Sequence, residues 1–151
     1  MCTPRRPFQI FSLCARGALL WLGLVLPTLA SSEIASASYE GPTTRYPHAV
    51  LGDDVEYSRL VAKLATGETL SVDLPPTLVF EDLAPRLVDM DQDGAPELIA
   101  IESHERQGAR LAIWSVRDGG LMRIANTDHI GTRFRWLAPV GVADIDGDGA
   151  L

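Results

Sequence analysis

The stretch Leu87–Ser103, LVDMDQDGAPELIAIES, decides the fold prediction because an acidic loop runs directly into an apolar segment. Its carboxylates stand at loop positions 1, 3, 5 and 9, which are Asp89, Asp91, Asp93 and Glu97. Without a counterion, carboxylates this close should repel one another and their pKa values should rise. Calcium reverses that repulsion, because it accepts six to eight oxygens at about 2.3–2.6 Å and alternate residues of a curled loop can face one ion. The spacing therefore predicts a calcium loop, and it suits magnesium less because Mg²⁺ demands stricter octahedral geometry.

An EF-hand begins with the same pattern and has to be tested separately. Gly94 permits the sharp turn that brings the position-7 carbonyl, from Ala95, toward the ion. An EF-hand also needs a bidentate glutamate at position 12 and flanking helices, whereas position 12 here is Ala100, within an apolar, strand-like run. The EF-hand interpretation is therefore rejected, and an acidic solvated turn between strands stays open as the simpler alternative.

The acidic loop recurs later in the chain. Leu83–Ala95 matches Leu137–Ala150 with one residue inserted, and Asp144 follows Asp89 by 55 residues. The second loop places Asp144, Asp146 and Asp148 at positions 1, 3 and 5, and Ala150 at position 7. A weaker match of residues 59–70 with residues 110–121 supports a similar period. A repeat of this size is typical of a small sheet of about four strands that must stack against neighbouring units.

Apolar segments and turn signals predict an all-β fold. Short apolar segments cover residues 98–101, 110–116 and 121–125, and Gly119-Gly120 between the last two is a hairpin signal. After the first thirty residues no segment sustains a 3.6-residue apolar period for three turns, so helices are not expected.

The segments LVDMDQDGAPELIAIES and VADIDGDGAL resemble the FG-GAP and VCBS repeats of integrin-like β-propellers. The resemblance implies blades of a β-propeller: residues 43–82 a partial blade without an acidic loop, 83–136 a blade, and 137–151 the start of the next. About two and a half four-stranded units cannot close a ring, so we expect the N-terminal fragment of a longer protein.

The resemblance also implies which residues bind calcium. The side-chain ligands would be Asp89, Asp91, Asp93 and Glu97 of the first loop and Asp144, Asp146 and Asp148 of the second, with Ala95 and Ala150 contributing carbonyls. Two departures from the family pattern stand out. Gln92 occupies a position where the family often has glycine, which should be harmless because that residue points away from the ion, and the second loop lacks its position-9 ligand.

The first thirty residues predict a signal peptide. They contain no acidic residue, carry Arg5, Arg6 and Arg16, and run through an apolar segment at 18–26 to a small-residue cleavage site ending at Ala30. The apolar run is too short for a spanning helix, which needs about 20 residues. Arg5-Arg6-Pro7-Phe8 partly resembles a twin-arginine signal, and an ordinary basic segment is an equal alternative. We therefore expect export to the periplasm or the extracellular space, no membrane span after cleavage, and a Ser/Ala-rich spacer at residues 31–42.

Net charge limits the classes of partner, and the positions of the cysteines limit disulfide formation. The chain has a formal net charge of −7, and after the leader Lys63 is its only lysine. Nucleic acids and anionic membranes are therefore disfavoured as partners. Both cysteines, Cys2 and Cys14, lie in the leader, so a disulfide is not expected in the mature chain.

Other polar and aromatic residues offer weak candidates for a site. His48, His104 and His129 fall in predicted turns without partners at ligand spacing, and neither Ser103-His104 nor Asp128-His129 carries a nucleophile signature. The aromatic residues Trp114, Phe134 and Trp136 fit packed strand positions better than a sugar-stacking platform.

The predicted function is a non-catalytic binding or adhesion module with structural calcium and an unknown protein or glycan ligand. One alternative is the N-terminal part of a propeller enzyme, a glycan lyase or lipid hydrolase, whose catalytic residues lie elsewhere. A purely structural spacer is another.

Overall fold

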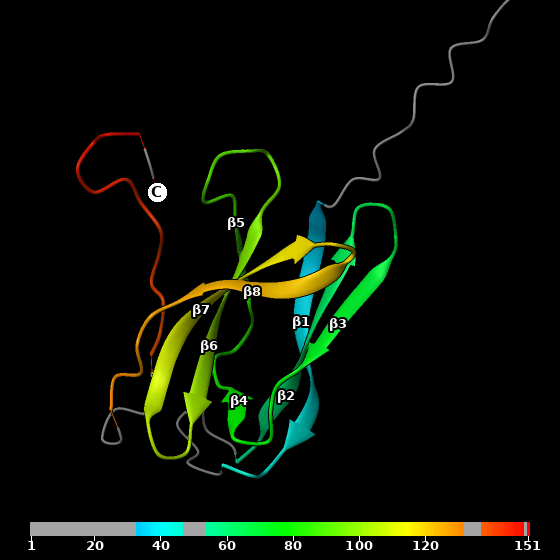
Figure 1. The fold of residues 1–151 in the computed structure, drawn as a ribbon, viewed down its shortest axis with the longest axis vertical. Helices are drawn as coiled ribbons and strands as arrows, with labels where there is room; N and C mark the ends of the chain where they lie inside the picture. Colours follow the sequence, from blue (N-terminus) through cyan, green and yellow to red (C-terminus); the bar gives the residue numbers. More distant parts are fainter. Residues whose placement is uncertain (1–32, 47–53, 132–136, 150) are drawn as a thin grey trace, which may run out of the picture.

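The computed structural model describes residues 33–46, 54–131, 137–149 and 151 (Figure 1). These residues form eight strands in one open antiparallel sheet and no helix, which confirms the predicted all-β class. The strands are β1 (Ile34–Thr43), β2 (Glu56–Leu64), β3 (Thr69–Asp73), β4 (Leu78–Phe80), β5 (Arg86–Val88), β6 (Glu97–His104), β7 (Gly108–Arg117) and β8 (Gly120–Asn126). Within these ranges, no helix has the length and apolar character needed to cross a membrane.

The acidic stretch belongs to a meander of four consecutive antiparallel strands, β5, β6, β7 and β8. Strands β6, β7 and β8 confirm the three predicted apolar segments and extend each of them by one or more residues. The hairpin between β7 and β8 turns at Asp118 and Gly119, whose φ angles are 51° and 76°. Two positive φ angles define the turn type that matches strand twist, and an Asp-Gly pair is among its preferred sequences. The loop glycine is therefore Gly119, while Gly120 already pairs with Arg117 in the sheet.

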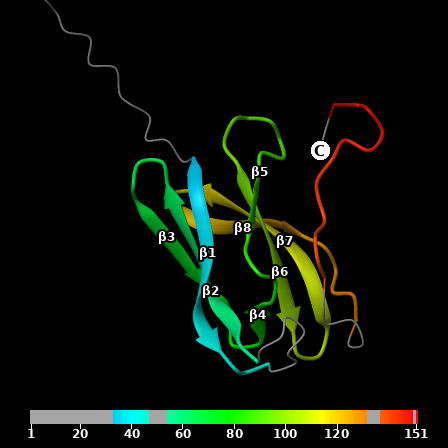
Figure 2. The ribbon, with the colours of Figure 1, turned by 180° about the vertical axis from the view of Figure 1, so that it is seen from behind.

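A second meander is formed by β1, β2 and β3. Strand β4 joins the two meanders, because Phe80 pairs with Tyr57 of β2 while Val79 pairs with Ser103 of β6. The boundary predicted between residues 82 and 83 is consequently not a boundary between separate sheets. In Figures 1 and 2, β4 lies at the end of the molecule opposite the loop between β5 and β6.

A spacer was predicted at residues 31–42, but most of this segment belongs to β1. This strand has ten residues and lies at the edge of the sheet. Ile34 and Tyr39 anchor this strand by burying their side chains in the core. Serine and alanine fill all four positions between these two anchors, and that composition concealed the strand in the sequence. Gly41 has a φ of 65°, and a Cβ there would lie 2.6 Å from Ser58 Oγ, so glycine lets β1 approach β2 closely.

The hydrophobic core lies between the two meanders. Phe80 of β4 stacks on Tyr39 with ring centroids 4.7 Å apart and meets the edge of Trp114 at 6.4 Å. Strand β1 also lies against β5, and β3 lies against β8. Burying each large apolar side chain contributes about 1.5–3 kcal/mol to the stability of the folded state. Burial of these side chains is therefore the main interaction that holds the two meanders together. Trp114 is thus a core residue, as the sequence predicted.

Several sequence predictions fall outside the described residues. These are the signal peptide at residues 1–30, His48, Phe134, Trp136 and Ala150.

Candidate metal centre

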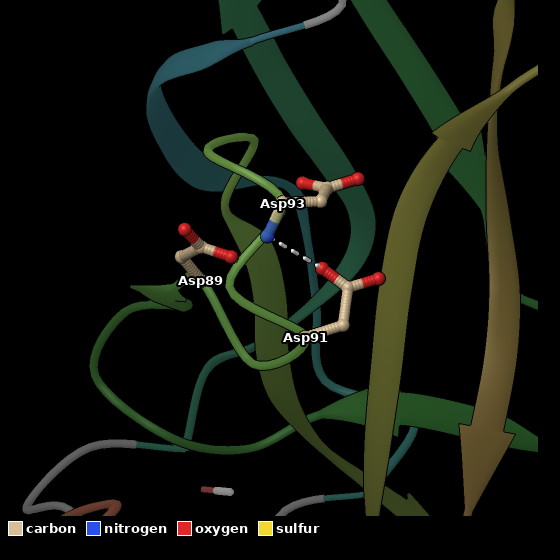
Figure 3. Close-up of side chains that lie close together, drawn as sticks. All are labelled: Asp89, Asp91 and Asp93. Atoms are coloured by element: carbon tan, nitrogen blue, oxygen red, sulfur yellow. Dashed lines mark hydrogen bonds between the residues drawn. The ribbon is translucent and has the colours of Figure 1, made fainter. Parts of the chain in front are cut away.

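The first acidic loop joins β5 to β6 at one end of the sheet (Figure 3). Val88 pairs with Glu97, so the antiparallel ladder brings the two ends of the loop together. The flanking elements are strands, and Ala100 lies inside β6 opposite Ala112. Both observations confirm that the loop is not an EF-hand.

Backbone amides shape this loop around its aspartates. Gly94 N–H donates to Asp89 Oδ2 at 3.0 Å, and Asp93 N–H donates to Asp91 Oδ1 at 3.2 Å. A further bond runs from Ala95 N–H to Asp93 Oδ1 at 2.8 Å. Figure 3 shows the three carboxylates projecting from this single loop, with the bond from Asp93 to Asp91 dashed. The sequence folds this way because each short acidic side chain can bond an amide a few residues further along the chain.

The spacing of the carboxylates fits one hard cation. Oxygen atoms of Asp89, Asp91 and Asp93 lie within 4.8 Å of one another. Calcium–oxygen distances are about 2.3–2.6 Å, so two oxygens on opposite sides of one ion are separated by roughly twice that distance. The spacing of the three side chains is thus compatible with their contacting the same ion.

One buried oxygen of the cluster accepts no hydrogen bond from the described residues. Asp89 Oδ1 is buried, and no hydrogen-bond donor among the described residues reaches it. A buried acceptor without a partner costs about 1–3 kcal/mol, and more when it is charged. The donor set is made of hard oxygens, which is the set that calcium and magnesium accept.

Glu97, the fourth predicted side-chain ligand, lies outside this group. It is the first residue of β6, its side chain is buried, and its Oε2 accepts a hydrogen bond from Met90 N–H at 3.0 Å. In this position Glu97 closes the loop onto its own start. The structure thus brings together three of the four side chains predicted for the first site.

The second acidic loop repeats the geometry of the first. Gly149 N–H donates to Asp144 Oδ2 at 2.8 Å, which corresponds to the bond between Gly94 and Asp89. Asp148 N–H donates to Asp146 Oδ1 at 3.4 Å, as Asp93 does to Asp91. Oxygens of the three aspartates again lie within 4.8 Å of one another.

The backbone of the two loops also agrees at positions 4 and 6. At position 4, Gln92 has a φ of 60° and Gly147 a φ of 77°. At position 6, Gly94 and Gly149 have φ angles of 90° and 92°. Left-handed backbone costs a residue other than glycine about 1–2 kcal/mol, so the motif has a physical reason to prefer glycine at both positions.

The expected rise in carboxylate pKa is not what Asp144 shows. Hydrogen bonds from the backbone amides of Gly149 and Gly147 hold the pKa of Asp144 below its usual value. These amides stabilise the ionised carboxylate more than its partial loss of solvent destabilises it. The lowered pKa favours the charged form of Asp144, which is the form that a metal ligand requires.

The two loops lie side by side at the same end of the molecule (Figures 1 and 2). The side chain of Gln92 extends from the first loop, and its Nε2 donates to the carbonyl oxygen of Gly149 at 2.5 Å. Gln92 is therefore more than a tolerated departure from glycine, because it connects the loops.

The sequence reasoning missed a buried charge cluster between β6, β7 and β8. Glu102 is fully buried, and its Oε2 accepts hydrogen bonds from Arg110 Nε at 2.9 Å and from Arg123 at 2.5 Å. Arg123 also lies 5.4 Å from the centre of the Trp114 ring. Burial raises the pKa of Glu102, although Arg123 opposes that rise. The only sequence signal is a glutamate that continues an apolar run, and the facing Arg110 is identified only by the strand register.

The serine and histidine candidates do not assemble into a triad. Ser103 is buried, and its hydroxyl donates to the carboxylate of Glu81. His104 is the last residue of β6, where Nδ1 accepts a bond from Arg106 N–H at 3.0 Å. His129 Nδ1 donates to the Gly108 carbonyl at 2.7 Å. The two histidine rings meet edge to face with centroids 5.8 Å apart, a contact that the sequence did not predict.

No protein-family model, no curated protein sequence and no solved structure matches this chain.

Proposed function

We propose that the chain is an exported calcium-binding β-repeat segment that acts as a non-catalytic binding or adhesion module for a protein or glycan ligand. The observation that carries the proposal is the same loop built twice. Asp89 and Asp144 start the two loops, each captures the amide of the glycine five residues later, and each belongs to a trio of aspartates with oxygens within 4.8 Å.

Calcium is the proposed ion because of the ligand chemistry and the openness of the loops. The donors are carboxylate oxygens, and Asp89 Oδ1 has no other partner among the described residues. Asp91 and Asp93 are exposed to solvent, so their contribution to affinity is moderate. Extracellular calcium modules bind at about 10⁻⁴–10⁻³ M, a range that suits an exported protein.

The role of the ion is proposed to be structural. The loop is anchored by β5, a strand of only three residues, so repulsion within the loop acts on a short piece of sheet. An ion that binds only the folded state stabilises it by RT ln(1 + [L]/Kd), which is about 1.4 kcal/mol at a free concentration ten times Kd.

The β-propeller arrangement remains part of the proposal, and three features support it. Strands β5–β8 form a four-stranded meander of the size expected for one blade. The meander of β1, β2 and β3 faces it, with β1 against β5 and β3 against β8. The second acidic loop lies beside the first at the same end of the molecule.

Thermal unfolding tests the structural role. The unfolding midpoint of the whole protein is measured with calcium, with magnesium and with a chelator, for the unsubstituted chain and for Asp91→Asn. We expect calcium to raise the midpoint most, and the substitution to remove a large part of that rise. Asp118→Asn is the matched control, because Asp118 is an aspartate in the β7–β8 turn and asparagine suits that turn equally well. A midpoint that does not depend on calcium would show that the structural role is wrong.

The binding role is tested separately with a panel of glycans and candidate proteins presented with calcium and with chelator. Retention of a ligand without its chemical change supports the module. Cleavage of a glycan or lipid by the purified chain would favour the enzyme alternative.

A further inference from the structure

We draw no further inference here: the strongest candidate, the apolar cavity of about 450 Å³ that Ile101, Leu111 and Ile130 form with the segment Leu137–Gly141 on the outer face of β6 and β7, carries nothing because nothing in the structure shows what covers it.

Discussion

The side-chain amide of Gln92 and the carbonyl oxygen of Gly149 are 2.5 Å apart, so a hydrogen bond joins two acidic loops that are separated by more than fifty residues of sequence. Gln92 makes this contact from a left-handed backbone conformation, with a φ of 60°. A favourable contact and an unfavourable conformation therefore meet in one residue, and substitutions can separate them.

Replacing Gln92 tests both effects. Gln92→Ala removes the bond between the loops but keeps a side chain at positive φ, so we expect a loss of a few tenths of a kcal/mol, up to about 1 kcal/mol. Gln92→Gly also removes the bond but relieves the backbone, and should be more stable than the alanine variant by roughly 1 kcal/mol. Urea unfolding of the two variants provides the comparison. Equal stability of the alanine and glycine variants would mean that the positive φ at this position carries no cost.

Replacing Gly94 tests the turn that shapes the first loop. Gly94 has a φ of 90°, and a Cβ built there would meet no atom within 4 Å, so Gly94→Ala changes backbone strain without a steric clash. We expect a destabilisation of about 1 kcal/mol or more and weaker calcium binding, because the strained turn no longer presents Asp89 and Asp91 together.

Gly141 is the matched control for this substitution. It also has open space around its Cβ position, but its φ is not in the left-handed region. Gly141→Ala should be neutral or slightly stabilising, since it only reduces the freedom of the unfolded chain. A Gly94→Ala variant as stable as Gly141→Ala would contradict the argument.

Glu102 should make stability fall as the pH rises. Burial raises the pKa of Glu102 in the folded protein, so the folded state keeps its proton at pH values where the unfolded state has lost it. The stability from this group is fully present below the unfolded value of 4.5, and is lost as the pH rises through the higher folded pKa. Glu102→Gln removes this ionisation, so the free energy of unfolding of the variant should fall less steeply as the pH rises above 4.5.

Urea unfolding across the acidic and neutral pH range measures this effect. Asp82, whose pKa is also raised by burial, should leave part of the slope in the Glu102→Gln variant. Profiles that run parallel in the variant and the unsubstituted protein would show that Glu102 does not titrate differently in the two states.

The sequence predicted the parts of the fold that depend on local alternation and turn chemistry. Strands β6, β7 and β8 carry apolar runs bounded by turn residues, and the hairpin predicted from Gly119-Gly120 is present with its turn one residue earlier, at Asp118-Gly119. Strand β4 was not predicted, because its three residues become a strand only by pairing with β2 and β6. Strand β1 was missed for a related reason: four residues lie between its buried anchors Ile34 and Tyr39, and all four have the small side chains of serine or alanine.

In the candidate site, too, the local features were predicted from the sequence and the contacts between distant segments were not. The spacing of Asp89, Asp91 and Asp93 is local, so the sequence predicted that their oxygens would gather. Glu97 bonds Met90 instead of joining them, since its place at the start of β6 fixes where its side chain can reach. The contacts between Gln92 and Gly149 and between Glu102 and Arg123 join distant segments, and no local pattern encodes them.

The most direct test of the calcium proposal is a calcium titration of the protein followed by backbone amide resonances. Gly94 and Gly149 are suitable reporters, because each amide bonds the first aspartate of its loop. Gly67 is the control, a positive-φ glycine in the turn between β2 and β3. We predict saturable shifts of the Gly94 and Gly149 resonances at about 10⁻⁴–10⁻³ M calcium and an unchanged Gly67 resonance. Shifts of Gly94 and Gly149 no larger than those of Gly67 across that range would contradict the proposal that these loops bind calcium.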